Sequence, residues 1–245
     1  MTGQAIKAVV FDLDNTLTDF MRAKDSAIHA AIDAMLDCGL TLDAATAHRR
    51  IYAIYQDEGI EYQRVFNHFL QQELGRVDWR MLAAAVVAYR HARDGRLVCY
   101  PHAKMVLNRL TRDGYGLAVV SDAPRLEAWL RLCRLGLHHN FDHVLTFDDT
   151  GARKPDPLPF QMALDQLGVQ AHEAVMIGDW PSRDVTGARD LGIHTVWARY
   201  GDVSPPYKDP ADVAAEEPHA AAAEFVVDNL AQLLDVLDQL NQGTT

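Results

Sequence analysis

The segment Ala5-Ile6-Lys7-Ala8-Val9-Val10-Phe11-Asp12-Leu13-Asp14-Asn15-Thr16 decides the fold, because it joins a short apolar run to two closely spaced acids. The apolar, β-branched part, residues 5–11, is typical of a buried parallel strand. Asp12 and Asp14 follow at the carboxyl end of that strand, which is the end where open α/β sheets bind ligands. The segment therefore predicts a sheet and a candidate site at its edge.

The rest of the chain divides into a helical stretch and an alternating stretch. From Arg22 to about Arg93 the apolar spacing is helical and no strand candidate interrupts it; helices are predicted from Arg22 to Gly39 and over residues 44–57, 61–74 and 79–92. After Pro101 helices alternate with strands, which are predicted over residues 116–121, 142–147, 174–178, 194–197 and 224–227. Alternation of this kind indicates a parallel α/β sheet.

These patterns together predict a doubly wound α/β core with an all-helical domain inserted after its first strand. The core takes residues 1–19 and 98–245, and the helical cap takes residues 20–97 and is expected to lie over the carboxyl edge of the sheet. Residues 201–223 contain four prolines among small and acidic residues and are predicted to form an exposed excursion with little regular structure. Residues 229–240 close the chain as an amphipathic helix.

Composition limits the possible partners. The net charge of −11 disfavours binding to nucleic acid or to an anionic membrane surface, so an anionic substrate must be captured by local groups. Cys38, Cys99 and Cys133 lack metal-type spacing and are predicted to be reduced. No signal peptide and no apolar run of about 18 residues is present, so we predict a cytoplasmic protein. The sequence leaves open whether the protein forms a homodimer.

Asp12 and Asp14 place two carboxylates in one small volume. Such crowding is costly without a cation, and Mg²⁺ prefers oxygen ligands of this kind. These two acids alone leave another interpretation open, since acids after strands are also common in turns and helix caps.

Three further features fall at or near the ends of predicted strands. Ser121 and Asp122 end one strand, Lys154 follows another in the proline-stiffened segment 151–157, and Asp179 follows a third with Asp184 five residues later. The hydroxyl, the following amides and the ammonium could hold phosphate, and the acids could hold a metal ion. Taken singly, Ser121 could be a helix cap, Lys154 a solvated surface lysine and Asp184 a helix cap.

In this order, the four segments resemble the motifs of the haloacid dehalogenase superfamily of hydrolases. Asp12, Asp14 and Thr16 match its Asp-x-Asp-x-Thr motif, and Ser121 and Lys154 match its second and third motifs. Gly178-Asp179 with Asp184 matches the acidic fourth motif. The helical insert resembles the cap of the subfamily that includes phosphoglycolate phosphatases, and the segments 34–40 and 179–184 are most similar to glyceraldehyde 3-phosphate phosphatase-like members.

This resemblance implies a Mg²⁺-dependent phosphatase that hydrolyses a small phosphorylated metabolite. Asp12 would be the nucleophile that forms an aspartyl phosphate, and Asp14 the acid and base. Ser121, Asp122 and Lys154 would bind the phosphate. The metal ligands would be Asp12, Asp14 through its backbone carbonyl, Asp179 and, directly or indirectly, Asp184.

Three alternatives remain at this stage. A phosphomutase would keep every motif, whereas a dehalogenase needs neither a metal nor an acid at the position of Asp14. A catalytically silent binding module is expected to lose a nucleophile or a metal ligand, and this chain retains them all.

Overall fold

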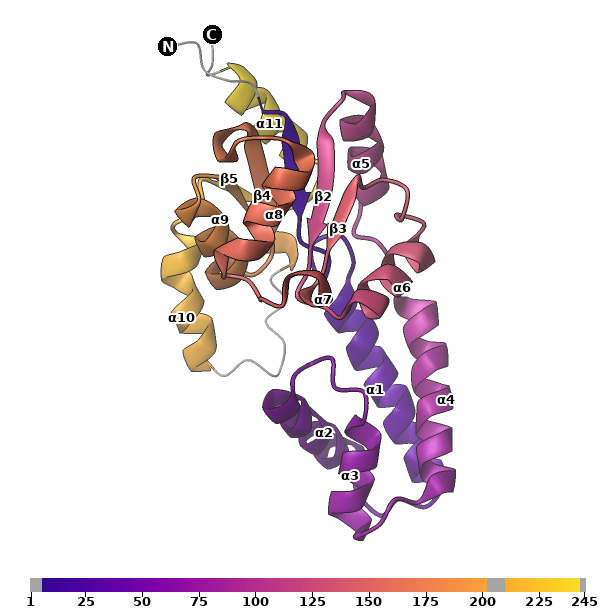
Figure 1. Cartoon of the computed structure of the whole chain (residues 1–245). Coiled ribbons are helices and arrows are strands. Elements are labelled where there is room, and N and C mark those ends of the chain that lie inside the picture. The colour runs from indigo at the N-terminus through magenta and orange to yellow at the C-terminus, as the bar shows by residue number, and fades with distance from the viewer. Residues whose placement is uncertain (1–5, 202–209, 243–245) are drawn as a thin grey trace. The chain divides into compact units, whose positions relative to one another are not determined.

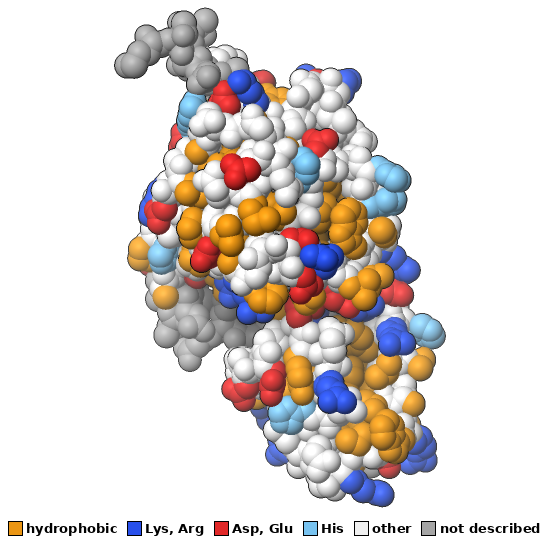
Figure 2. Space-filling view, viewed as in Figure 1, with side chains coloured by type: hydrophobic (Ala, Val, Ile, Leu, Met, Phe, Trp, Pro, Cys, Tyr) orange, Lys and Arg blue, Asp and Glu red, His pale blue; other side chains and the backbone are white. Residues whose placement is uncertain are grey.

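The computed structural model describes residues 6–201 and 210–242, and their contacts divide the chain into two compact units. One unit comprises Met1–Asp19 and Val98–Thr245, and the other comprises Phe20–Leu97. Within the described residues no helix is both long and apolar enough to cross a membrane. On the face that Figure 2 displays, Lys and Arg side chains are scattered among Asp and Glu side chains.

The first unit is built on a six-stranded parallel sheet in the order β3-β2-β1-β4-β5-β6 (Figure 1). The strands are β1 (Ala8–Phe11), β2 (Gly116–Val120), β3 (His143–Leu145), β4 (Ala174–Gly178), β5 (His194–Ala198) and β6 (Phe225–Val227). Its helices are α5 (Ala103–Arg112), α6 (Arg125–Leu135), α7 (Phe147–Thr150), α8 (Pro157–Leu167), α9 (Thr186–Asp190), α10 (Pro210–Ala220) and α11 (Gln232–Gln242), with short turns η1 (Ala171–Glu173), η2 (Pro181–Val185) and η3 (Arg199–Gly201). The predicted doubly wound α/β fold is therefore confirmed.

Alternation of side chains along the strands gives the sheet two buried faces. One face packs against α8 and α9 in a core cluster that contains Val10, Ala118 and Met176 from the strands and Phe160 from α8. Neighbouring strand residues such as Val9 and Phe11 point to the opposite face because the side-chain period of a strand is two. They are fully buried as well, which explains why β1 is apolar at every position.

The second unit consists, in the described residues, of the helices α1 (Phe20–Asp37), α2 (Ala44–Glu58), α3 (Val65–Leu74) and α4 (Trp79–Arg96). Its longest packing surface lies between α1 and α4, and α1 buries an apolar stripe at helical spacing, Ala27, Ile28, Ala31, Ile32 and Met35. Inside this unit, the Lys24 ammonium donates a hydrogen bond to the Ile60 carbonyl at 2.6 Å and lies over the Tyr55 ring.

The two chain segments that connect to this helical unit run beside each other within the first unit. The Thr18 hydroxyl and the Asp19 amide both donate hydrogen bonds to the Val98 carbonyl, at 3.0 and 3.2 Å. The Tyr100 amide donates to the Leu17 carbonyl at 3.0 Å. The insertion therefore leaves and re-enters the sheet unit at one place.

Three sequence predictions need correction. The Tyr62 amide donates a hydrogen bond to the Gly59 carbonyl and closes a turn over residues 59–62, and the third helix begins at Val65 rather than at Glu61. The last helix begins at Gln232 instead of Asn229. The predicted irregular excursion is wrong for residues 210–220, which form α10, while residues 202–209 lie outside the described part of the chain.

Candidate active site

The site lies where the chain connections on the two halves of the sheet diverge. From β1 the connections lead outward to β2 and β3, and from β4 they lead the other way to β5 and β6. Such a switch point leaves a crevice at the carboxyl ends of the two central strands. Phe11 of β1 pairs with Ile177 of β4, so Asp12 and Asp179 follow adjacent strands at nearly the same level.

Three buried carboxylates meet at this edge. One oxygen from each of Asp12, Asp179 and Asp184 lies within 4.8 Å of the others. The Asp184 carboxylate is held in place by the Trp180 amide, which donates a hydrogen bond to Oδ2 at 3.0 Å. A Cβ atom at position 178 would lie only 2.2 Å from that oxygen, so the glycine at the end of β4 makes the close approach of Asp184 possible.

Lys154 places a cation between two of these acids. Its ammonium nitrogen lies 2.5 Å from Oδ1 of Asp12 and 2.7 Å from Oδ1 of Asp184, and only 3% of its side chain is exposed. The Lys154 backbone amide donates a hydrogen bond to Oδ1 of Asp122 at 2.9 Å. Asp122 therefore fixes the loop that carries the lysine, and Lys154 is a buried partner of the acids instead of a solvated surface residue.

Burial controls the protonation of this cluster. It raises the pKa of Asp12 to about 7; the attraction of Lys154 lowers this pKa, whereas the Asp184 charge raises it. Burial also raises the pKa of Asp179 well above its usual range, and the charges of Asp12 and Asp184 act in the same direction. Burial alone would lower the pKa of Lys154, but the Asp12 and Asp184 carboxylates raise it above its usual range, so the ammonium stays charged.

The cluster has the charge and the donors that suit a divalent cation. Three carboxylates and one ammonium would carry a net charge of −2 in a buried volume if every acid were ionised, and the raised pKa values of Asp12 and Asp179 mean that this ionisation is disfavoured without a cation. Oδ2 of Asp12 is buried and accepts no hydrogen bond from any described residue. Because carboxylate oxygens are the ligands that Mg²⁺ prefers, the residues present fit that ion.

The loop after β1 is shaped by a left-handed residue. Asn15 has φ of 60°, a conformation that asparagine tolerates better than most residues, and its amide donates to the Thr18 carbonyl at 2.7 Å. The turn brings the Thr16 hydroxyl to 3.3 Å from Oδ1 of Asp179, to which it donates a hydrogen bond. Thr16 therefore links the first motif to the fourth.

Ser121 lies at the neighbouring strand end. It follows β2, whose Val119 pairs with Phe11, and it is buried. Its hydroxyl accepts a hydrogen bond from the Ala123 amide at 3.2 Å, which tightens the turn into α6. The structure thus places Ser121 at the carboxyl edge of the sheet in a turn before α6, whose N-cap is Pro124, so Ser121 is not the helix cap that the sequence left open.

Asp14 has a partner that sequence reasoning missed. Nη1 of Arg131 donates a hydrogen bond to Oδ2 of Asp14 at 2.9 Å, and the arginine side chain is only 6% exposed although it belongs to α6. A buried guanidinium needs an acidic partner, and here it holds the carboxylate in a fixed position. The only sequence signal was an arginine on the apolar face of a helix, beside the buried Leu132 and Ala128.

Glu216 of α10 is a second missed residue. Its carboxylate accepts hydrogen bonds from the indole nitrogen of Trp180 at 2.8 Å and from the amide and hydroxyl of Ser182 at 2.9 and 2.7 Å. These bonds hold the loop between Asp179 and Asp184 from outside the cluster. Helix α10, in a segment that the sequence predicted to be irregular, therefore helps to fix the conformation of the fourth motif.

Residues 6–192 match the family description "haloacid dehalogenase-like hydrolase". The match covers most of the chain, and with the fold it shows that this protein belongs to the haloacid dehalogenase-like hydrolases, as the four motifs predicted. The same family places the protein among the enzymes.

Individual relatives narrow this class. The chain is 32% identical over 239 residues to a glyceraldehyde 3-phosphate phosphatase of Pyrococcus furiosus, which covers 96% of this chain and 95% of the relative. It is 32% identical over 202 residues to a phosphoglycolate phosphatase of Rhodospirillum rubrum, with 80% of each chain covered. These relatives support the predicted class of phosphoric monoester hydrolase.

Solved structures agree in fold. A HAD phosphatase from Thermococcus onnurineus superposes with a TM-score of 0.66 at 27% identity, covering 95% of this chain and 98% of the other. A 2-haloacid dehalogenase from Pseudomonas syringae pv. Tomato DC3000 superposes with a TM-score of 0.63, also at 27% identity, covering 96% and 99%. The fold is thus shared by phosphatases and dehalogenases, so the choice between them depends on the site.

Proposed function

We propose that this protein is a Mg²⁺-dependent phosphatase that hydrolyses a small phosphorylated metabolite through an aspartyl phosphate on Asp12. The observation that carries the proposal is the buried cluster of Asp12, Asp179, Asp184 and Lys154 at the switch point of the sheet. A purely structural cluster has no need for three buried acids whose joint ionisation is disfavoured without a cation, whereas a metal-assisted phosphoryl transfer uses them.

The Asp12 carboxylate is the nucleophile in this mechanism. Its oxygen attacks phosphorus, the bond from phosphorus to the ester oxygen breaks, and the leaving alcohol takes a proton from Asp14. Water then attacks the phosphorus of the acyl phosphate, Asp14 takes the proton from that water, and phosphate leaves as Asp12 is regenerated. Lys154 fixes the orientation of the Asp12 carboxylate throughout, with an Nζ to Oδ1 distance of 2.5 Å.

Asp12, Asp179 and the backbone carbonyl of Asp14 would hold the Mg²⁺ ion, with Asp184 either as a ligand or as an orienting group. When bound, the ion neutralises charge on the transferring phosphoryl group. The amides after Ser121 and the ammonium of Lys154 supply the remaining positive electrostatic potential for the phosphate oxygens.

Arg131 adds to the proposed role of Asp14. The ion pair holds the Asp14 carboxylate in one rotamer and stabilises its ionised form, which is the form that accepts a proton from water in the second step. Arg131 is therefore a positioning residue in this mechanism.

The substrate proposal follows the relatives. Five of them, from five different organisms, are glyceraldehyde 3-phosphate phosphatases, so glyceraldehyde 3-phosphate is the first compound to test. We propose that residues 20–97 form the cap domain that selects among such small phosphate esters.

The dehalogenase alternative is disfavoured by the paired, partly buried position of Asp14 and by the acids at positions 179 and 184. A silent binding module is disfavoured because the nucleophile, the lysine and the acids lie together. A phosphomutase keeps the same cluster and is separated from a phosphatase by its product.

The test measures phosphate release from glyceraldehyde 3-phosphate, phosphoglycolate, phosphoserine and ribulose 1,5-bisphosphate, with Mg²⁺ and with a chelator. We expect release that needs Mg²⁺ and that is lost in the Asp12→Asn variant, while Asp190→Asn, a change at an exposed aspartate of α9, keeps full activity. Release that Asp12→Asn leaves unchanged would refute the proposal, and phosphate that moves within a sugar substrate would support the mutase.

A further inference from the structure

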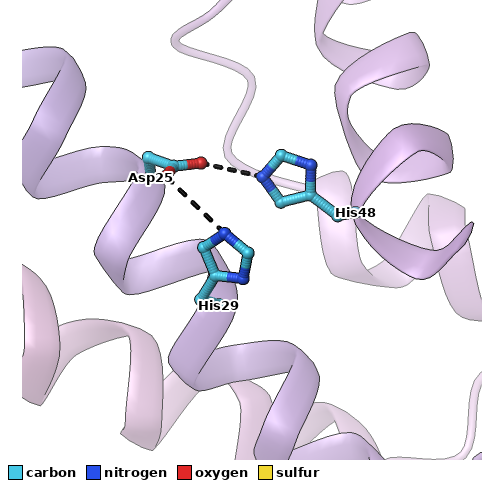
Figure 3. Close-up of side chains that lie close together, drawn as sticks. All are labelled: Asp25, His29 and His48. Carbon is cyan, nitrogen blue, oxygen red and sulfur yellow. Dashed lines mark hydrogen bonds and ion pairs between the residues drawn. The ribbon is translucent and has the colours of Figure 1, made fainter. Parts of the chain in front are cut away.

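A second group of potential metal ligands lies in the helical unit, away from the carboxylate cluster in the sequence. Figure 3 shows Asp25 and His29 on α1 and His48 on α2 with their side chains converging on one point. One donor atom from each lies within 4.8 Å of the other two. The proposed phosphatase reaction uses none of these three residues.

We propose that Asp25, His29 and His48 form a binding site for a divalent transition-metal ion such as Zn²⁺. Zinc sites with three protein ligands combine imidazole nitrogens with a carboxylate and leave further positions to water. Mg²⁺ and Ca²⁺ prefer oxygen ligands, so two imidazoles among three donors select against them.

Helix geometry explains how the ligands come together. Asp25 and His29 are four residues apart on α1, which puts both on the same face one turn apart. His48 comes from the first half of α2, whose start is fixed by the Asp43 side chain accepting a hydrogen bond from the Thr46 amide at 2.9 Å. The third donor is therefore held by a well-defined helix start.

The distances suit a tetrahedral ion. Nε2 of His48 lies 2.8 Å from Oδ1 of Asp25, and Nε2 of His29 lies 3.6 Å from Oδ2 (Figure 3). Ligands about 2.1 Å from a tetrahedral Zn²⁺ ion are separated from one another by about 3.4 Å. Both observed distances, which run to the two different oxygens of Asp25, are within about 0.6 Å of that separation, and one donor atom from each of the three residues lies within 4.8 Å of the other two.

Neighbouring groups fix the positions of the three donor side chains, and one of the donors is exposed to solvent. The His29 and His48 rings stack with centroids 4.5 Å apart, and the Tyr52 hydroxyl donates a hydrogen bond to Oδ1 of Asp25 at 3.3 Å. A ligand carboxylate that also accepts such a bond has its orientation fixed. His48 is largely buried, whereas the His29 side chain is 55% exposed and gives access from solvent.

A bound ion would connect α1 to α2 within the helical unit. Because the ion binds the folded unit and not the unfolded chain, it raises the free energy of unfolding of that unit, and this gain grows with the logarithm of the free ion concentration once that exceeds the Kd.

The experiment titrates Zn²⁺ into the full chain against a chromophoric chelator, with excess Mg²⁺ present to occupy the carboxylate cluster. Titration with Co²⁺ reports the same site by its visible absorption. We expect the parent protein to bind one equivalent of Zn²⁺. The affinity for Zn²⁺ should be at least about 10-fold to 100-fold weaker in His29→Ala and in His48→Ala. His91→Ala, at an exposed histidine of α4, is the control and should bind as the parent protein does.

His29 is half-exposed, so His29→Ala is expected to fold normally even if His48→Ala does not, and circular dichroism checks both. Zn²⁺ should raise the unfolding midpoint of the parent protein and of His91→Ala but not of His29→Ala. Equal Zn²⁺ affinity in the parent and His29→Ala, or no binding to the parent in the presence of Mg²⁺, would overturn the proposal. Neither result bears on the phosphatase reaction, which is assayed separately.

Discussion

Replacing Lys154 by methionine removes the only ammonium that the described residues place between the Asp12 and Asp184 carboxylates, which lie 2.5 and 2.7 Å from it. Methionine keeps much of the side-chain volume, so the main effect is electrostatic. Removal of one partner from a buried ion pair typically costs about 3–5 kcal/mol, because the other charge stays buried without compensation. For a chain of this length that loss lowers the unfolding midpoint by roughly 6–20 °C.

The assay is thermal or denaturant unfolding of the Lys154→Met variant in the presence of a chelator. Lys7→Met is a matched control, because the Lys7 ammonium pairs with Glu173 at 2.6 Å while its own side chain is 55% exposed, and such a pair contributes less than about 1 kcal/mol. Adding Asp184→Asn to Lys154→Met should recover part of the lost stability, since it removes one of the crowded charges. A Lys154→Met variant no less stable than Lys7→Met, or no recovery in the double variant, would refute this account of the cluster.

Two further changes test the partner of Asp14 and the start of α7. Arg131→Met should lower kcat by about 10-fold to 100-fold, because Asp14 loses a charged hydrogen bond of about 1.5–3 kcal/mol that favours its role as base in the second step, and steady-state kinetics should show no such loss in Arg134→Met, an exposed position on the same helix. Partial burial raises the pKa of Asp149, but the hydrogen bonds from Thr146 and Arg125 outweigh this effect and hold the pKa below 3.8. The ionised Asp149 carboxylate therefore stabilises the folded protein above its unfolded pKa of about 3.9, and this stabilisation is lost as the pH falls through the lower folded pKa. Asp149→Asn should lower the free energy of unfolding by about 1 kcal/mol at pH 7 and by progressively less below pH 4, as measured by unfolding at a series of pH values.

Local patterns were enough to predict the sheet and the helical insertion. The strands β1, β2 and β4 are short apolar runs that are buried at nearly every position, and helices such as α1 and α11 show apolar spacing, so both periods are visible in the sequence. The strand ends then identify Asp12 and Asp179, because parallel strands bring their carboxyl ends to one edge. Lys154 lies beyond β3 and α7, so its assignment depended on the resemblance to the family motifs, and its contact with Asp12 is a tertiary one.

Arg131 and α10 could not be predicted in the same way. Arg131 lies mid-helix, where a charged residue usually faces water, and its burial depends on the distant chain position of Asp14. The prolines of residues 201–223 suggested irregular structure, yet Pro210 begins α10, a position at which proline needs no amide hydrogen bond. The hydrogen bonds of Glu216 with Trp180 and Ser182 are tertiary contacts, and such contacts leave no local pattern in the sequence.

The central claim, that Asp12 becomes phosphorylated, can be tested directly by rapid quenching during turnover followed by borohydride reduction, which converts an acyl phosphate to an alcohol. Mass spectrometry of the peptide that contains Asp12 then shows which carboxylate had been modified. We predict reduction at Asp12 that requires both a phosphorylated substrate and Mg²⁺. Reduction at another carboxylate, or phosphate release without any reducible acyl phosphate, would contradict the mechanism.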